Sequence, residues 1–294
     1  LQDRSYDKVT GNATLQYAFD SEDITTYLTT GTSYRPGGAT VSARDLGPYQ
    51  EFLEEDSWFV EAGVKSSLLD NRLRLNAAVF YQDYSDYIGR VNRIAINNGG
   101  VPRPDGSPTH ETSLTTNGDA EVMGVELDFE YLLGANWQIA GGLSYVEAEY
   151  KDGTRIPCND GDIPAGSVLN TCDVGGETLG TQPPLSASLR SEYTIPFDSF
   201  DSYVRGLYRF VDRRDDRDAN GGELGAYAIF DLHAGLRDPA DVWDVSVFVR
   251  NLFDREAKQD VQPVYRDFNG DPTGYQKVQV EPGRLVGISA TYRF

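Results

Sequence analysis

The last residues of the chain, 284–294, alternate apolar side chains with small or polar ones up to the final phenylalanine. Val286, Ile288, Ala290, Tyr292 and Phe294 share one side of this period-two pattern. Such alternation predicts a β-strand whose two faces meet different surroundings. A soluble domain seldom ends within an amphipathic strand of this kind, so the pattern favours the closing strand of a membrane β-barrel.

Composition excludes a helical membrane protein and is compatible with a barrel. The mean hydropathy is −0.47, and no stretch reaches the roughly 18 apolar residues that a spanning helix needs. Barrel strands are apolar only at alternate positions, so their mean hydropathy stays low. The net charge of −20 also argues against nucleic-acid binding, which needs clustered lysine and arginine.

Period-two segments recur along the whole chain and predict about eleven antiparallel strands of about 9–13 residues, the length of a tilted spanning strand. Short turns alternate with long polar loops, two of which we place at 35–56 and 88–119. Outer-membrane barrels show this asymmetry, with short periplasmic turns and longer extracellular loops. The alternative, a soluble β-sandwich, does not explain the alternation of connection lengths.

The strand count predicts that the chain is part of a larger barrel. If the short turns are periplasmic, the first and last strands both run inward, whereas single-chain bacterial barrels have even strand numbers. Doubling about eleven strands gives the 22 strands of the large plugged outer-membrane transporters.

Five stretches carry recognisable motifs: SYRPGG (33–38), FVEAGVKSSLLDNRLRLNAAVFYQDYSDY (59–87), MGVELDFEY (123–131), VFVRNLFDRE (247–256) and PGRLVGISATYRF (282–294). Together they resemble the C-terminal half of the β-barrel of TonB-dependent outer-membrane receptors. The resemblance implies that residues 1–294 form one all-β unit, the C-terminal part of a 22-stranded transmembrane barrel. It also implies a plug domain that is absent from this chain.

The resemblance further implies a function and a location. It suggests an importer of a scarce ligand in the outer membrane of a Gram-negative bacterium, with a ferric siderophore as the default ligand and energy supplied by the TonB complex through the plug. The alternatives are import of a carbohydrate, cobalamin or an aromatic compound, and a passive porin or structural barrel.

Other expected partners are outer-membrane lipid, lipopolysaccharide, the small-molecule ligand and the barrel-assembly machinery. Tyr292 and Phe294 match the aromatic ending that this machinery reads in the family; simple anchoring at the membrane interface is the alternative. No nucleophile, base and orienter occur at recognisable spacing, so we expect neither an enzyme nor a required cofactor. His233 falls on the polar side of its strand, where a structural histidine is the simpler interpretation.

Two groups of residues are candidates for ligand binding: Tyr84, Tyr87 and Arg90, and Arg213, Arg214 and Arg217. The planar guanidinium group of arginine suits carboxylate and catecholate oxygens, which predicts an anionic or aromatic ligand. The alternative is that the three later arginines pair with the neighbouring aspartates or with lipopolysaccharide.

Asp216, Asp218 and Asn220, followed by Gly221, reproduce the opening spacing of a calcium-binding loop. The twelfth position is Tyr227 where such loops have a bidentate glutamate. Asp267, Asn269 and Asp271 form a similar cluster in the last long loop. Runs of this kind are also ordinary turn sequences, so a structural calcium ion and a plain turn both remain open.

Cys158 and Cys172 lie in one segment rich in glycine, aspartate and asparagine. Their short separation permits a loop-closing disulfide, which would persist in an oxidising compartment such as the periplasm or the cell surface. Two reduced loop cysteines are the alternative.

Overall fold

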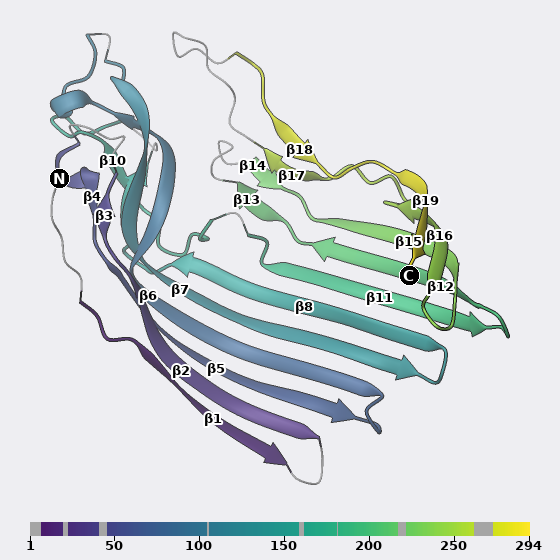
Figure 1. Cartoon of the computed structure of the whole chain (residues 1–294). Helices are drawn as coiled ribbons and strands as arrows, with labels where there is room; N and C mark the ends of the chain where they lie inside the picture. The colour runs from purple at the N-terminus through teal and green to yellow at the C-terminus, as the bar shows by residue number, and fades with distance from the viewer. Residues whose placement is uncertain are drawn as a thin grey trace.

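The computed structural model describes residues 7–19, 23–40, 46–104, 106–158, 162–180, 182–216, 222–261 and 273–294. One antiparallel sheet of eleven strands dominates the structure (Figure 1). Its strands, in spatial order, are β1 (Gly11–Phe19), β2 (Ile24–Arg35), β5 (Glu55–Leu68), β6 (Leu73–Ile96), β7 (His110–Leu133), β8 (Trp137–Tyr150), β11 (Leu185–Pro196), β12 (Asp201–Val211), β15 (Tyr227–Arg237), β16 (Trp243–Arg250) and β19 (Leu285–Tyr292). The all-β prediction of about eleven antiparallel strands is confirmed.

The remaining elements are short and lie in the long connections, at the end of the sheet opposite the short turns (Figure 1). Four two-stranded ribbons are formed by β3 (Gly38–Ala39) with β4 (Glu51–Phe52), β9 (Arg155–Cys158) with β10 (Asn170–Asp173), β13 (Arg214–Asp216) with β14 (Gly222–Leu224), and β17 (Lys258–Val261) with β18 (Val278–Val280). Two 3₁₀ turns, η1 (Gly47–Gln50) and η2 (Asn98–Gly100), complete the described segments. Among these residues, no helix has the length and apolar character needed to cross a membrane.

The strand register gives the sheet one apolar and one polar face. In one cross-strand row Leu143 lies between Leu127 and Ala187. In the next row Ser144 lies between Glu126 and Ser186. Because successive side chains of a strand point to opposite sides, these rows define an apolar face, with Leu143, and a polar face, with Ser144.

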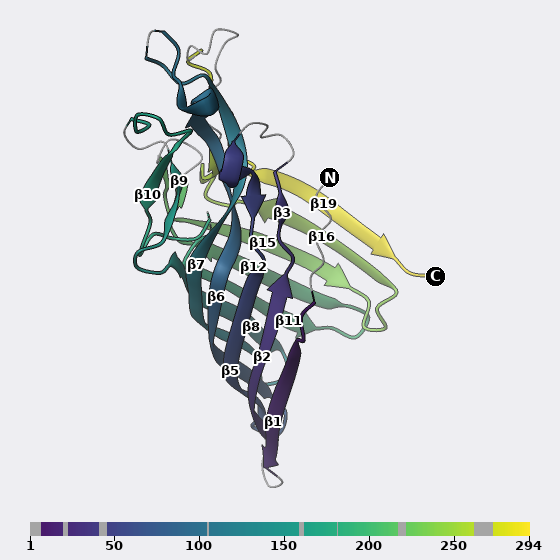
Figure 2. The ribbon, with the colours of Figure 1, turned by 90° about the vertical axis from the view of Figure 1, so that its left-hand side faces the viewer.

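The two faces differ in how tightly their side chains are crowded. On the polar face Tyr203 and Glu192 are only 4% and 8% exposed, whereas Val247 and Ile288 on the apolar face are 54% and 74% exposed. Crowding on one side is expected where a twisted sheet curves, and Figure 2 shows the sheet curving from β1 to β19. The polar face therefore lines the concave side, and the apolar face is turned to the surroundings.

The prediction of a loop over 88–119 is wrong, because β6 and β7 are each 24 residues long and continue as a hairpin beyond their neighbours. The register shifts between Tyr84 and Tyr87 and between Val91 and Ile94. Each bulge interrupts the period-two pattern, so the sequence shows no continuous alternation there. The loop predicted over 35–56 is shorter than expected, since β5 already begins at Glu55.

The closing strand β19 places Tyr292 opposite Trp243 of β16, on the apolar face. The side chain of Arg293 forms an ion pair with Asp241 in the β15–β16 turn, and its backbone N–H donates to the carbonyl oxygen of Val242 at 2.8 Å. The end of the chain is thereby tied to the short-turn end of the sheet.

We expect Leu143→Arg, near the middle of the apolar face of β8, to destabilise the membrane-inserted full-length protein by about 2–4 kcal/mol, because an arginine side chain is then exposed to hydrocarbon. Ser144→Arg is the matched control, since its side chain lies on the polar face. Reversible denaturation in lipid vesicles measures both variants. Equal destabilisation by the two substitutions would contradict this assignment of the faces.

Candidate functional site

The long connections pack on the polar side of the β6–β7 hairpin beyond Tyr84. Because the two bulges restore the alternation, Tyr84, Tyr87, Val91, Ile94 and Ile96 all point to this side. Two buried clusters cover them: Leu46 and Leu169 pack with Ile94, Ile96 and Leu114, and Ile156, Val174 and Leu179 pack with Ala120 and Tyr150. We call the described residues within 46–54, 84–120 and 150–180 the cap.

Tyr84 and Tyr87 belong to the wall of the second cluster. Their ring centroids are 5.5 Å apart in an edge-to-face arrangement, and the Arg35 guanidinium lies 5.7 Å from the centroid of Tyr87. Burial, and then the nearby Glu55 carboxylate, raise the pKa of Tyr84 above its ordinary value. The Tyr84 hydroxyl is therefore a neutral hydrogen-bonding group at physiological pH.

Arg35 and Glu55 fix the base of the cap where β2 meets β5. Arg35 Nε donates to Glu55 Oε1 at 3.0 Å, and Arg35 Nη2 donates to the carbonyl oxygen of Ile88 at 2.7 Å. The backbone N–H of Ile88 donates to Glu55 Oε2 at 2.7 Å. Glu55 is only 5% exposed, and its carboxylate oxygens accept hydrogen bonds from Arg35 and from the backbone of Ile88. Glu55 is therefore a structural anchor of β6.

Arg90 does not join the two tyrosines. It follows Gly89, which pairs with Thr116 on the polar side, so the Arg90 side chain points to the opposite face of the hairpin. Its Nε donates to Asn92 Oδ1 at 3.1 Å. The structure therefore brings together Tyr84 and Tyr87 and separates Arg90 from them.

Arg213 and Arg214 line a cavity of about 460 Å³ between the end of β8 and the segment that leads into β11. Glu147 and Glu149 of β8 are also among its lining residues, and the Glu147 carboxylate accepts a hydrogen bond from the Tyr145 hydroxyl. Leu179 belongs both to this lining and to the second cap cluster, which places the cavity next to the cap.

The two arginines differ in how they are held. The Arg214 guanidinium donates to the carbonyl oxygen of Gln259, and this fixes the side chain. The Asp212 carboxylate accepts a hydrogen bond from the backbone N–H of Arg213 at 2.8 Å. The arrangement suits a ligand that carries both negative and positive groups, and it offers no nucleophile with a general base.

Several of the predicted ligand-binding and calcium-binding residues lie outside the described part of the chain. They are Arg217, Asp218 and Asn220 in the loop after β13, and Asp267, Asn269 and Asp271 in the last long loop. Of Asp216 the backbone is placed, paired with Gly222 at the end of the β13–β14 ribbon where the two strands are joined. Within the described ranges, no group of three or more histidine, cysteine, aspartate or glutamate residues is arranged to hold a metal ion. The calcium site stays a prediction.

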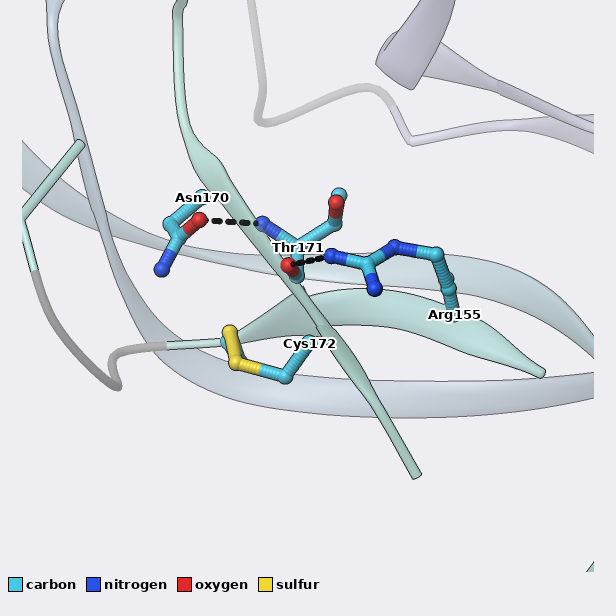
Figure 3. The surroundings of a disulfide bond; sticks show 5 residues. Arg155, Asn170, Thr171 and Cys172 are labelled. Carbon is cyan, nitrogen blue, oxygen red and sulfur yellow. Dashed lines mark hydrogen bonds between the residues drawn. A yellow bond between two sulfur atoms is a disulfide. The ribbon is translucent and has the colours of Figure 1, made fainter. Parts of the chain in front are cut away.

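Cys158 and Cys172 form a disulfide that joins β9 to β10, with their Cα atoms 5.8 Å apart (Figure 3). Arg155 Nη2 donates to the carbonyl oxygen of Thr171 at 2.6 Å, and the Thr171 N–H donates to Asn170 Oδ1 at 2.9 Å. Ile156, in β9, belongs to one cap cluster. Leu169, the residue before β10, belongs to the other. The disulfide thus closes the segment that connects the two clusters.

Asn117, a residue of β7 that we did not predict as important, links β6 and β7 to the segment that follows β4. Its Oδ1 accepts from the backbone N–H of Leu53 at 2.6 Å, and its Nδ2 donates to the carbonyl oxygens of Leu53 at 3.2 Å and Asp86 at 2.7 Å. In sequence it resembles any asparagine of a polar loop, so no pattern could have singled it out.

An ion-pair network occupies the polar face near the short turns. Glu192 accepts from Arg205 Nε at 2.6 Å and from Arg237 Nη1 at 2.7 Å, and both guanidinium groups lie 5.2 Å from the ring centroid of Tyr203. His233 follows on the same face, and its ring lies 5.7 Å from that of Phe248. Because the charges of the network pair with one another, none of them is left buried without a partner.

A sequence profile described as the β-barrel of TonB-dependent receptor-like proteins matches residues 1–252. The chain belongs to the TonB-dependent receptor β-barrel family. Members of this family are transporters, not enzymes, and lie in the outer membrane of Gram-negative bacteria. The predicted family, location and absence of enzymatic activity are therefore confirmed.

Two curated relatives show how much of a receptor this chain represents. It is 25% identical to the pesticin receptor of Yersinia pestis over 98% of its own length and 36% of that protein. It is 27% identical to the metal-pseudopaline receptor CntO of Pseudomonas aeruginosa over 76% of its length and 26% of that protein. The chain thus spans about a third or less of each relative.

Solved structures show the same fold. The sheet aligns with the ferric yersiniabactin uptake receptor FyuA from Yersinia pestis at a TM-score of 0.62 and 20% identity, covering 96% of this chain and 37% of that one. With the copper transporter OprC the TM-score is 0.66 at 16% identity, covering 97% and 39%. At these identities the alignments support the barrel fold alone.

Asp86 provides a pH-dependent test of the cap. It has a left-handed φ of 55°, and burial, followed by the carboxylates of Asp119 and Asp56, raises its pKa. A raised pKa means that ionising Asp86 disfavours the folded state, so its contribution to stability falls as pH rises through the folded-state pKa. An asparagine at this position tolerates the same φ without the charge.

We therefore expect Asp86→Asn to stabilise the cap at pH 7.5 and to have no effect below pH about 3, where Asp86 is protonated in both states. Limited proteolysis of the cap in the full-length protein, with variant and wild type compared at each pH, measures the difference. A stabilisation that is equal at both pH values would contradict the electrostatic explanation.

Replacing both cysteines, Cys158→Ser with Cys172→Ser, should loosen the β9–β10 ribbon. A disulfide between residues 14 positions apart raises the free energy of opening by about 3 kcal/mol, because it limits the conformations of the open segment. Without it we expect faster amide hydrogen exchange over 155–173. Exchange in β12 should be unchanged, because its ladder lies within the sheet. Unchanged protection of the ribbon would show that its packing alone holds it.

Proposed function

We propose that this chain is the C-terminal part of the barrel of an outer-membrane importer, and that residues 1–294 form half of a 22-stranded wall. The observation that carries the proposal is the eleven-stranded sheet with one apolar and one polar face. It aligns with 37% of one solved receptor chain and 39% of another. A polar concave face suits a water-filled or plugged lumen, and an apolar convex face suits lipid.

The two edges of the sheet support this proposal. In the described part of the chain β1 and β19 each pair on one side only, and they lie at opposite ends of the sheet (Figure 1). In hydrocarbon an unpaired edge leaves backbone N–H and C=O groups without partners, at several kcal/mol for each group. We therefore expect further strands of the same protein to pair with both edges and close the barrel.

The proposed transport is energy-coupled import, in which the TonB complex acts on a plug domain encoded outside these residues. As ligand we favour a metal chelate, with a ferric siderophore first. The names of the relatives support this choice, since they include a metal-pseudopaline receptor and a ferric yersiniabactin uptake receptor. Carbohydrate, cobalamin or aromatic compounds are the alternative ligands, and a passive pore is the alternative mechanism.

We place the ligand at the cavity that Arg213 and Arg214 line, with Arg217 as a further candidate on the same loop and Tyr84 and Tyr87 in the neighbouring cap. The supporting feature is a wall that contains two arginine and two glutamate residues. Such a wall can pair with both the acidic groups and the amines of a chelate. Tyr292 and Phe294 remain our proposal for the signal read by the assembly machinery.

Uptake by the native strain tests the transport proposal. We expect iron starvation to raise expression of the full-length protein and deletion of its gene to abolish uptake of a labelled ferric siderophore. Collapse of the proton gradient should stop uptake, because the transport is energised. Uptake that persists after collapse would indicate a passive pore, and unchanged siderophore uptake in the deletion strain would favour another ligand.

For the ligand site we expect Arg213→Ala and Arg214→Ala each to raise the KM for uptake roughly tenfold, the loss of one charge-assisted hydrogen bond. Arg90→Ala is the control, because its side chain points to the other face of the hairpin. Equal effects of all three substitutions would show that general surface charge, and not this cavity, governs binding.

A further inference from the structure

The apolar face contains a hollow of about 440 Å³ between β8, β11, β12 and β15. Four aromatic side chains surround it: Trp137, Tyr193, Tyr208 and Phe230. Ser191 and Gly206 form its floor. An ideal Cβ built on Gly206 would lie 3.3 Å from Phe230 Cζ, so the absent side chain is what leaves this space open.

The hollow lies in the part of the apolar face nearest the short turns. Ser191 and Gly206 are cross-strand partners, and Ser191 precedes the last residue of β11, Pro196, by five positions. For a strand tilted by about 45° this corresponds to roughly 12 Å along the membrane normal. With the short turns on the periplasmic side, the hollow is at the depth of the acyl chains of the periplasmic leaflet.

The hollow is lined mostly by apolar and aromatic side chains, which suits hydrocarbon. Trp137 Nε1 donates to Ser191 Oγ at 2.9 Å, so the indole N–H has an acceptor inside the hollow. No charged side chain is among its described lining residues. The hollow is continuous with the apolar face that meets the membrane, and leaving it empty would forfeit dispersion contacts of four rings.

The rim below the hollow is aromatic and acidic. In the β11–β12 turn the rings of Phe197 and Phe200 stack with centroids 4.9 Å apart, and Asp198 between them is exposed. The arginines at this end pair with carboxylates: Arg205 and Arg237 share Glu192, Arg237 also lies 3.8 Å from Asp201, and Arg293 pairs with Asp241. Near the hollow the local charge therefore suits a headgroup with a cationic ammonium and not a purely anionic one.

We infer that the hollow is a seat for one acyl chain of a periplasmic-leaflet phospholipid, and that Asp198 favours phosphatidylethanolamine over phosphatidylglycerol. The aromatic rings hold the chain, and the Phe197–Phe200 pair marks the level of the glycerol and headgroup. The inference concerns the lipid-facing surface and is independent of the transported ligand.

The test is native mass spectrometry of the full-length receptor in detergent, titrated with the two phospholipids carrying identical acyl chains. Gly206→Leu places a side chain in the hollow. We expect it to lower the apparent affinity for phosphatidylethanolamine about tenfold, the loss of about two methylene contacts. Asp198→Asn should remove the preference for phosphatidylethanolamine and leave binding of phosphatidylglycerol unchanged.

Val247→Leu is the matched control. Val247 lies in the same cross-strand row as Val204, through Ala234, but outside the hollow. It should leave lipid binding unchanged. If Gly206→Leu fails to assemble, Ser191→Leu fills the same space from β11.

Equal lipid binding by wild type, Gly206→Leu or Ser191→Leu, and Val247→Leu would overturn the proposal. So would retention of lipopolysaccharide, a second copy of the receptor or another protein at this site in place of a phospholipid.

Discussion

The structure depends on the need to pair every backbone hydrogen-bonding group where water is absent. Nine of the eleven sheet strands, β2 to β16, have partners on both sides, and this continuous ladder is what allows a chain with few long apolar runs to occupy a membrane. The same requirement explains the alternation of side chains. A single layer of strands has one face for lipid and one for the interior, so apolar residues are needed only at every second position.

Charged side chains on the polar face are the second consequence of this single-layer wall. Glu192 pairs with both Arg205 and Arg237 beside the ring of Tyr203, Arg237 also lies near Asp201, and the Tyr203 hydroxyl donates to Asp244 at 3.0 Å. A charge buried without a partner is costly, and mutual pairing avoids this cost while it links β11, β12, β15 and β16.

The cap is stabilised by different interactions from those of the sheet. It lies beyond the apolar face and contains small hydrophobic clusters like those of a soluble domain. The extended β6–β7 hairpin is its support, and the segments that follow β2 and β8 fold against one side of it. Asn117, the Arg35–Glu55 pair and the disulfide hold these segments at separate points. The cavity with Arg213 and Arg214 borders the cap, so the organisation of the cap also shapes the proposed ligand site.

The sequence by itself determined the sheet, the number and order of its strands, and which residues face lipid. The alternation of apolar and polar side chains is a property of each strand alone, so it can be recognised without knowing which strands are neighbours. It did not determine the cap. The bulges that place Tyr84 and Tyr87 on one side and Arg90 on the other shift the register without leaving a period in the sequence, and the partners of Ile94 and Ile96 are distant in the chain. The hollow at Gly206 likewise arises from four separate strands, so only the tertiary structure reveals it.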